Sequence, residues 1–311
     1  MYLCGATTNE LVRTFDTTIN KAEHYIRKLI LEGKAPRKYA NHPANKDDEL
    51  GLDNGDLKRY TDYWQFTSRS GYMIATDFHA PFYSQIWFER MLKVAKLRGL
   101  TEIIIPGDGL DMHAFSGWGG DPECPWSKEL LGAANFLWGL YQSFDRIWYM
   151  SGNHEARLAR LTDGQMTYSG VLDGILCEYA RRSGLTFEFD PGKLTWSQYT
   201  HAIVDDEWLI VHPASYRTLP LSVANRLALV QNKHVISAHS HKANKGHADN
   251  GRIIIDTGGM FDEELIDYRA MRQTVHAKWA NGFVVYQGGV ADLYADFPYT
   301  NWDRIDGGQY V

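Results

Sequence analysis

The sequence has few cysteines and no long apolar run. Its 311 residues include only three cysteines, Cys4, Cys124 and Cys177, at irregular spacing. An odd number without a repeated spacing is not typical of a disulfide framework, so we expect free thiols in a reducing compartment. No stretch approaches the roughly 20 apolar residues of a membrane-spanning helix, and the first residues lack an apolar signal region. These features predict a cytoplasmic protein without a membrane segment.

An excess of positive charge is also missing. The net charge is −6, and hydrophobic residues make up 44% and charged residues 23% of the chain. This composition is ordinary for a globular protein, and it argues against binding of nucleic acid through overall positive charge. A length of 311 residues allows one sizeable domain and a small second one.

Five apolar stretches each end sharply at polar residues that can bind metals. The clearest is Ile103–Ile105, followed by Pro106, Gly107 and then Asp108. Three β-branched residues in succession predict a buried strand, and proline with glycine ends it. In open α/β sheets, ligands bind at the carboxyl ends of the strands, which is where this pattern puts Asp108. A single aspartate at such a turn is more often a turn former or a helix cap.

Four further stretches repeat this pattern of strand, stop and polar cluster. The polar residues that follow them are Asp77 and His79; Asn153, His154 and Glu155; His212; and His239 and His241. Residues i and i+2 of an extended segment point the same way, so Asp77 and His79 are expected to form a pair of donors, as are the last two histidines. Carboxylates and imidazoles together favour zinc, manganese or iron. Alone, His212 could be a core histidine, but five such clusters in order favour a metal site.

Together these clusters resemble the signature of the calcineurin-like metallophosphoesterase superfamily. The signature consists of D-x-H, G-D-x-x-D, G-N-H-E, a lone histidine and H-x-H, and here it covers about residues 70–290. It is specific for the superfamily but says little about the substrate. The fold that this resemblance implies is α/β: a metallophosphoesterase β-sandwich flanked by helices, with the metal site at the carboxyl ends of the strands.

The resemblance also implies two divalent metal ions that share one carboxylate. One ion would be bound by Asp77, His79, Asp108 and His241, and the other by Asp108, Asn153, His212 and His239. A hydroxide bridging the two ions would attack phosphorus, because the metals lower its pKa. His154 would then protonate the leaving oxygen or stabilise charge on the phosphoryl group. The ligand types accept manganese, iron, zinc or nickel and do not select one of them.

Two departures from the protein-phosphatase branch favour phosphodiesters as substrates. Those enzymes carry arginine directly after G-D-x-x-D, where this chain has Met112, and they have a single late histidine in place of H-x-H. Both differences point to the phosphodiesterase and nuclease branches. The function that we expect is a binuclear, metal-dependent hydrolase of phosphate esters, leaning to phosphodiesters, with nucleic acid among the candidate substrates. The alternatives are a phosphomonoesterase acting on small phosphates, or a DNA-binding protein with an accessory metallophosphoesterase domain.

Three further residues are candidates for substrate binding. Arg157 lies about one helical turn after His154, so it could face the same site and hold a phosphate. His113 and Trp118 belong to the loop of residues 112–126 and could stack on a base or an aromatic leaving group. The alternatives are a surface arginine and a packed loop that does not touch the substrate.

Apolar periodicity predicts longer helices between the clusters. They are expected at residues 85–97, 127–144, 171–182 and 221–232. Two late apolar runs, residues 252–255 and 282–286, are expected to be strands of a second sheet.

Residues 1–66 are expected to form a separate unit and linker, ahead of a catalytic domain at residues 67–311. Two predicted helices, at residues 10–15 and 19–31, resemble a helix-turn-helix. The first 40 residues hold seven basic and four acidic side chains, a mild excess that leaves DNA binding and a plain helical appendage as equal alternatives. The expected partners are a phosphodiester substrate and, through this unit, DNA. No membrane contact is expected, and an oligomer stays open.

Overall fold

The computed structural model describes most of the chain after residue 61. The described residues are 62–68, 70–116, 124–161, 168–215, 217–266, 279–297 and 300–306. The predicted helix-turn-helix and Trp118 lie outside them. Within these ranges, no helix combines the length and the apolar character that a bilayer crossing requires.

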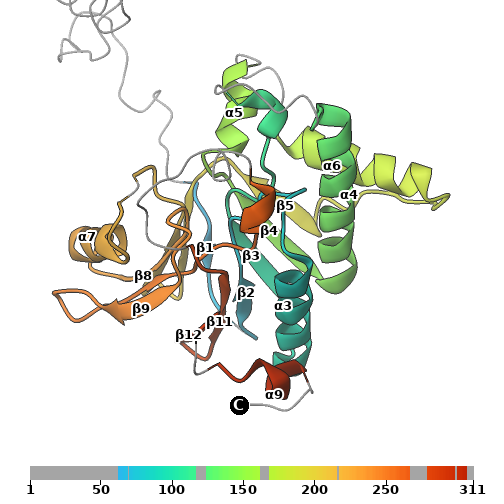
Figure 1. Ribbon diagram of the computed structural model, residues 1–311. Helices are drawn as coiled ribbons and strands as arrows, with labels where there is room; N and C mark the ends of the chain where they lie inside the picture. The colour runs from blue at the N-terminus through green and yellow to red at the C-terminus, as the bar shows by residue number, and fades with distance from the viewer. Residues whose placement is uncertain are drawn as a thin grey trace, which may run out of the picture. The chain divides into compact units, whose positions relative to one another are not determined.

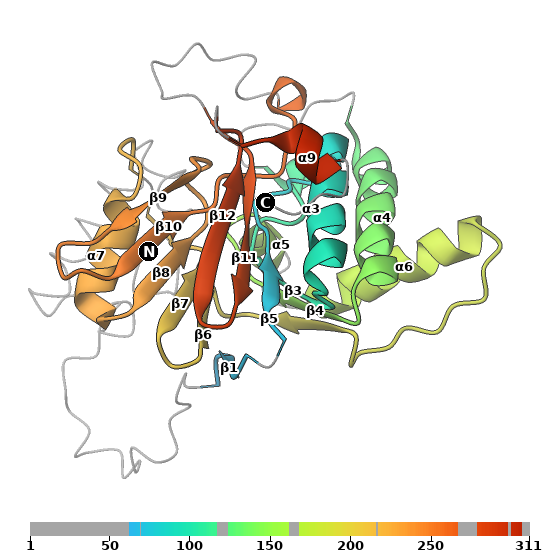
Figure 2. The ribbon, with the colours of Figure 1, turned by 90° about the horizontal axis from the view of Figure 1, so that it is seen from below.

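Two six-stranded sheets form the centre of the described chain (Figures 1 and 2). The first sheet contains, in spatial order, β12 (Val290–Ala295), β11 (Gly282–Gln287), β2 (Tyr72–Ile74), β3 (Glu102–Pro106), β4 (Arg146–Met150) and β5 (Leu194–Ser197). The second contains β1 (Gln65–Phe66), β6 (His201–Val204), β7 (Trp208–Val211), β8 (His234–Ser237), β10 (Ile253–Asp256) and β9 (Asn244–His247). Strands β2 to β5 run parallel, as do β7, β8 and β10, so each sheet has one edge where several carboxyl ends meet.

The two sheets pack face to face through a shared apolar core. This core is made of fully buried side chains from both sheets, among them Ile74, Ile104, Met150, Trp208, Ile210 and Ile236. Alternate residues of the first sheet, such as Ile103 and Ile105, belong to a second core on its other face, because successive side chains of a strand point to opposite faces. The strand at Ile103–Ile105 is therefore buried on both sides, as its β-branched run predicts.

Helices cover the outer faces of the two sheets. The helices α3 (Gln85–Arg98), α4 (Trp126–Ser143) and α6 (Tyr168–Arg182) pack on the first sheet, and α7 (Ser222–Gln231) packs on the second (Figure 2). All four predicted helices are confirmed, with ends that differ from the prediction by no more than three residues. The short helix α9 (Trp302–Asp306) contacts α3. This arrangement confirms the expected α/β class, a β-sandwich flanked by helices.

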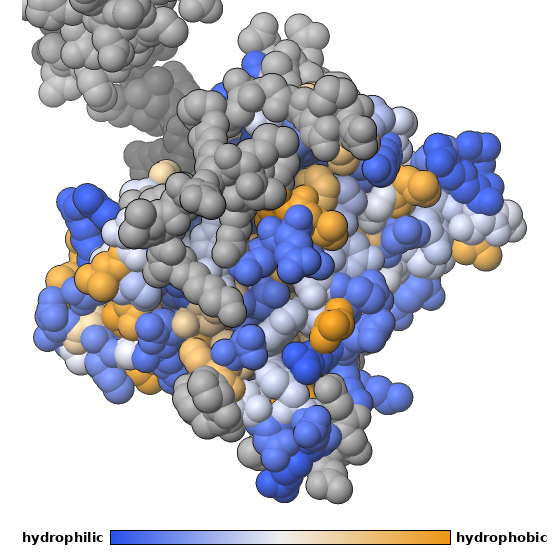
Figure 3. Space-filling model, in the orientation of Figure 1, coloured by the Kyte–Doolittle hydropathy of each residue, from blue (hydrophilic) through white to orange (hydrophobic). Residues whose placement is uncertain are grey.

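Exposed apolar residues are scattered over the helices and loops. Leu219, just before α7, and Val230, in the last turn of α7, are 71% and 70% exposed. On the face seen in Figure 3, hydrophilic residues predominate and hydrophobic ones form small separate groups. Such scattering is normal for a protein surface and calls for no partner.

The expectation that residues 252–255 and 282–286 share one sheet is wrong. Strand β10 pairs with β8 in the second sheet, whereas β11 pairs antiparallel with β2 in the first. The two runs have similar apolar sequences because both strands are largely buried. An apolar sequence predicts burial, but it does not predict which strand is the neighbour in the sheet. Strand β1 also joins the second sheet at Gln65, two residues before the expected start of the catalytic domain.

Candidate metal centre

The five polar clusters meet where the carboxyl ends of five strands come together. The loops after β2, β3 and β4 leave one edge of the first sheet, and the loops after β7 and β8 leave the neighbouring edge of the second. Contacts between side chains join the two sets of loops. The Nε2 of His241 lies 3.1 Å from Oδ1 of Asp77, and the Nε2 of His212 lies 3.5 Å from Oδ2 of Asp108. Segments more than 160 residues apart thus form one buried site.

Most residues of this site have a left-handed backbone. The positive φ values are 51° at Asp77, 48° at His79, 49° at Asp108, 71° at His239 and 55° at His241. Aspartate and histidine tolerate this region better than most residue types, and such strained positions concentrate at functional sites. The segments are therefore not extended, contrary to the geometry assumed from the sequence. The two members of D-x-H still converge, but the two histidines of H-x-H belong to different clusters.

The first cluster contains Asp77, His79 and His241. The two histidine Nε2 atoms face each other at 3.2 Å. The Nδ1 of His79 lies 2.8 Å from a carboxylate oxygen of Asp111, so it donates there, and its Nε2 keeps a lone pair. This Nε2 faces the other imidazole, and it lies 4.0 Å from Oδ1 of Asp77. The Nε2 of His241 donates to Asp77 in one tautomer and carries a lone pair in the other, and in the second form the three side chains can share a cation.

The second cluster contains Asp108, His212 and His239. The Nδ1 of His212 donates to the backbone carbonyl of Pro106 at 2.9 Å, so its Nε2 is the nitrogen that can bind a metal once it is deprotonated. That Nε2 lies 3.0 Å from Oδ1 of Asn153 and 3.5 Å from Oδ2 of Asp108. An imidazole nitrogen, an amide oxygen and a carboxylate oxygen therefore converge, and this donor set fits a transition-metal ion.

The ionisation of the two aspartates and of His239 suits metal binding. Burial lowers the pKa of His212, but the charge of Asp108 outweighs this and raises it, so a metal would displace a proton there. Burial opposes charge on both Asp77 and Asp108, but hydrogen bonding and charge from His241 lower the pKa of Asp77, and the charge of His154 lowers the pKa of Asp108. Burial and the nearby His212 lower the pKa of His239 to about 4. At neutral pH the carboxyls are charged and this imidazole is neutral, and these are the forms that bind metals.

His154 lies beside the two clusters. Its ring centroid is 4.5 Å from that of His79, and its Nε2 is 3.7 Å from Oδ2 of Asp108. Its Nδ1 lies 2.6 Å from the backbone oxygen of Asp111. Burial lowers its pKa, but the charge of Asp108 and the bond to Asp111 outweigh this and raise the pKa of His154 to about 9. A protonated imidazole at this place can give a proton to a bound substrate.

A third group of possible ligands, formed by His79, Asp111 and His154, is satisfied without a metal. The Nδ1 atoms of both imidazoles point at one carboxylate oxygen of Asp111, at 2.8 and 3.2 Å. Burial opposes ionisation of Asp111, but hydrogen bonds from three histidines hold the pKa of its carboxyl well below the usual value. Asp111 therefore orients the two imidazoles as an acceptor of hydrogen bonds.

Arg157 belongs to the site and is not a surface arginine. Its side chain is only 16% exposed, and its Nη1 donates to the backbone oxygen of Asp111 at 2.9 Å. Its Nη2 lies 3.0 Å from the Nε2 of His154. The helix α5 (Glu155–Leu161) accounts for this, because residues three apart on a helix share a face. A guanidinium beside this imidazole can donate hydrogen bonds to an anion.

His113, the other candidate for substrate contact in the described residues, is packed inside the protein. It is 5% exposed, its ring meets Phe82 edge-on at 5.8 Å, and its Nδ1 lies 3.7 Å from Oδ2 of Asp111. The rings of Phe115 and Trp126 pack against each other at 4.7 Å. The described part of this loop is therefore a packed segment next to Asp111. This supports the alternative that the loop packs against the protein and does not touch the substrate.

Glu155 holds the metal-binding loops together, a role that sequence alone does not reveal. Its Oε2 accepts hydrogen bonds from the backbone N–H groups of Asp108 and Gly152, at 2.9 and 2.7 Å. Its Oε1 accepts from the N–H of Gly109 at 3.1 Å and from the hydroxyl of Tyr149 at 2.9 Å. Only glycine fits at position 152, because a Cβ there would overlap the carboxylate of Asp108. One buried carboxylate thus joins the loops after β3 and β4.

We expect Glu155→Gln to lower the free energy of unfolding by about 2–4 kcal/mol, because an amide presents one oxygen to these donors and turns an N–H toward the others. Urea denaturation of the metal-free protein measures the change. Glu178→Gln, an exposed carboxylate on α6 that pairs with two arginines, serves as the control and should change stability little. Equal losses in both variants would contradict the role assigned to Glu155.

Comparison with known proteins gives structural similarity only. No family model matches the sequence, and no curated protein matches it. The phosphoesterase Yfce from E. coli is 13% identical over 71% of this chain and 90% of its own, with a TM-score of 0.36. A predicted phosphoesterase from Streptococcus pneumoniae is 7% identical over 72% and 97%, with a TM-score of 0.31. A dimetal phosphatase from Danio rerio is 10% identical over 72% and 98%, with a TM-score of 0.32. Likeness at these values carries no argument about activity.

Proposed function

We propose that this chain is a two-metal hydrolase of phosphate esters. The observation that supports this best is the convergence of two groups of possible metal ligands, carboxylates and imidazoles, in one site. Asp108 would serve both ions, since a carboxylate has two oxygens that can hold cations about 3.5–4 Å apart. Bound there, the two ions would supply a nucleophile at neutral pH and balance charge on the phosphoryl oxygens. The donor types accept manganese, iron, zinc or nickel.

His154 and Arg157 would act on the substrate directly. His154 is fixed through its Nδ1 by the backbone of Asp111, so its Nε2 is turned toward the metal site, where it can protonate a leaving oxygen. Arg157 contacts the same Nε2 and would bind a phosphoryl oxygen next to it. A guanidinium and a protonated Nε2 both donate, so Arg157 would turn from His154 to a phosphoryl oxygen when His154 carries the proton.

Phosphodiesters are the substrates that we favour. Met112 stands where protein phosphatases carry arginine, and it is fully buried in the apolar core and brings no charge to the site. A diester carries one negative charge, so it needs fewer cationic donors than a monoester dianion. Nucleic acid is one member of this substrate class.

A phosphomonoesterase is the second candidate, and one observation favours it. Arg157 lies beside His154 instead of on the open surface, and it supplies a cationic donor of the kind that a monoester dianion needs. The choice between the two candidates therefore depends on whether this guanidinium binds the substrate or only holds His154.

With manganese supplied, we expect bis(p-nitrophenyl) phosphate to be hydrolysed with a higher kcat/KM than p-nitrophenyl phosphate. Both release the same leaving group, so the comparison reports on how the site binds the remaining part of the substrate. Arg157→Gln should reduce monoester hydrolysis more than diester hydrolysis, whereas Arg160→Gln, an exposed arginine on the same helix, should change neither. A monoester preference of about tenfold, or 1.4 kcal/mol, would instead establish the second candidate.

DNA binding by the N-terminal unit is a separate proposal, which rests on the sequence of residues 1–66 alone. Its mild basic excess predicts weak binding that falls as salt rises. A chain without residues 1–60 should lose this binding and keep its metals. Undiminished affinity for DNA in the shortened chain would exclude the N-terminal unit as the binding element.

A further inference from the structure

Glu129, in the first turn of α4, is a buried carboxylate that the proposed function does not use. Its Oε1 accepts a hydrogen bond from the backbone N–H of His113 at 2.9 Å, and its Oε2 accepts one from that of Ala114 at 3.1 Å. Both N–H groups belong to the short 3-10 helix η5 (His113–Phe115), and the first N–H groups of a helix find no acceptor within it. Glu129 therefore holds the backbone of the segment that follows Asp111.

The ionised form of Glu129 is the one that fits these two contacts. Burial raises the pKa of Glu129, and the hydrogen bonds from the backbone of Ala114 and His113 oppose this. A protonated carboxyl, or an amide, would turn a donor toward one of the two N–H groups, so only the carboxylate accepts from both. Burying a charge is unfavourable unless hydrogen bonds compensate for it, so the two contacts and the burial of this side chain depend on each other.

Asp111, just before this segment, connects a metal-binding imidazole with the proton donor. Its Oδ1 lies 2.8 Å from Nδ1 of His79 and 3.2 Å from Nδ1 of His154. On one side its backbone is fixed by its own N–H, which donates to the carbonyl of Ala80 at 2.9 Å. On the other side the chain turns at Met112, whose φ of 52° is left-handed. Such a conformation persists only where its surroundings enforce it, and the hydrogen bonds to Glu129 follow directly after this turn.

We propose that Glu129 is a positioning residue that acts through Asp111 on His79 and His154. The proposal rests on the proposed function, in which these two imidazoles are a metal ligand and the proton donor. By holding the chain after the left-handed turn, Glu129 keeps the carboxylate of Asp111 where one oxygen accepts from both imidazoles. Without this hold both imidazoles would be oriented less well, whereas the second metal-binding cluster would keep its own hydrogen bonds.

Metal affinity tests this role without reference to catalysis. We would titrate manganese into the metal-free full chain by calorimetry, with His79→Ala and His239→Ala as markers for the first and the second ion. Glu129→Gln should weaken the first ion by about tenfold and the second by no more than about twofold. Glu129→Asp keeps the charge but is one methylene shorter, so it should give the same pattern with a smaller loss if Glu129→Gln does not fold. Ala133→Gly lowers stability one turn further along α4 and keeps the carboxylate, so it should change neither affinity.

A double-mutant cycle separates positioning from plain support of the fold. If Glu129 acts through Asp111, Glu129→Gln should have little further effect on the first ion in a chain that already carries Asp111→Asn. A residue that only supports α4 and η5 would give additive losses instead. With substrate, Glu129→Gln should lower kcat more for esters of alcohols than for p-nitrophenyl esters, because the proton donor His154 is displaced as well.

The outcomes separate this inference from the proposed function. A selective loss at the first ion that disappears in the Asp111→Asn chain supports the positioning role. Equal losses at both ions, additive losses in the cycle, or a loss no greater than that of Ala133→Gly would overturn it and leave the metal centre in place. If the unaltered chain bound no manganese, the metal centre itself would be refuted, and the role of Glu129 would fall with it.

Discussion

Replacing Asp108 with asparagine is expected to lower metal content from two ions per chain to fewer than two and to reduce kcat/KM by about 10³-fold or more. The amide is neutral and offers one donor oxygen, so it cannot balance two neighbouring cations. Asparagine is preferable to alanine here, because Asp108 has a φ of 49°, a region that asparagine tolerates. In the structure, Oδ1 of Asp108 accepts a hydrogen bond from the backbone N–H of His154 at 2.9 Å, and the side-chain oxygen of asparagine can still accept it. The loss therefore reports on charge and coordination more than on folding.

Metal analysis of the purified variant after gel filtration gives the decisive number. His79→Ala is the comparison, because this residue belongs to the first of the two metal-binding clusters and not to the second, so its loss should weaken mainly one ion. Chelation of the metals from the unaltered chain should abolish activity, and manganese should restore it. Two ions per chain in Asp108→Asn would disprove the bridging role, whatever the activity of that variant.

His154→Asn is expected to keep both metals and to lower kcat by about 10²–10⁴-fold, the range typical of a lost general acid. His154 is a member of neither metal-binding group, although its ring packs on that of His79, and its backbone bond to Asp108 does not depend on the side chain. The loss should be greatest for esters of alcohols, whose alkoxide leaves poorly unless it is protonated. It should be smallest for p-nitrophenyl esters, whose anion leaves without a proton.

A series of leaving groups with rising pKa measures this dependence. His113→Asn is the matched control, because His113 is also a buried histidine near Asp111 but contacts neither metal-binding group. Its effect should be small and independent of the leaving group. If His154→Asn slowed good and poor leaving groups equally, proton donation would be refuted, and stabilisation of negative charge on the phosphoryl group would explain the role of His154.

The sequence by itself determined which residues can bind metals and in what order the strands present them. Each cluster follows a short apolar run, and such a run is a local signal that needs no partner strand. The four longer helices were predictable for the same reason, because apolar periodicity is a property of neighbouring residues. The α/β sandwich followed from the resemblance that these motifs carry.

The tertiary structure decided between two expectations for His239 and His241, a shared pair of donors from their spacing and separate ions from the resemblance. His239 and His241 are two residues apart, yet they belong to different clusters, because both have positive φ and the segment is not extended. The pairing of β11 with β2 was likewise not predictable, since both late strands are equally apolar and the choice of partner depends on packing.

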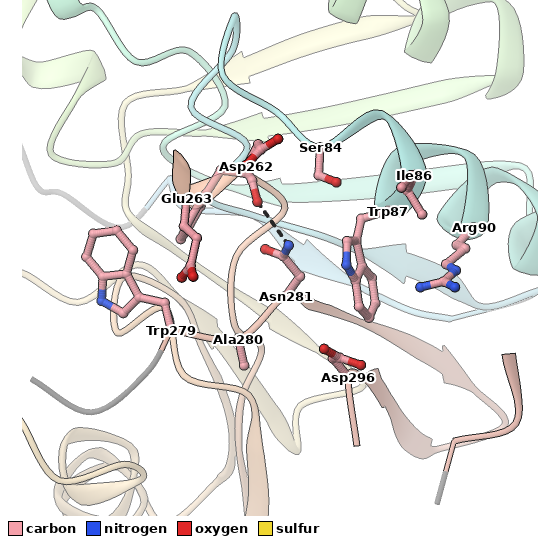
Figure 4. A pocket seen from close by; sticks show the side chains of 11 residues that line it. Ser84, Ile86, Trp87, Arg90, Asp262, Glu263, Trp279, Ala280, Asn281 and Asp296 are labelled. Atoms are coloured by element: carbon pink, nitrogen blue, oxygen red, sulfur yellow. Dashed lines mark hydrogen bonds between the residues drawn. The ribbon is translucent and has the colours of Figure 1, made fainter. Parts of the chain in front are cut away.

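The positions of Arg157 and Glu155 depended on tertiary contacts as well. Arg157 meets the backbone of Asp111, 46 residues earlier, and Glu155 meets that of Asp108, 47 residues earlier. A cavity next to Phe261 depends on contacts between residues that are still farther apart in the sequence, since Ser84 and Asp296 both line it (Figure 4). The physical reason is that sequence fixes the chemistry of each side chain, whereas the packing of two sheets against each other fixes which side chains meet.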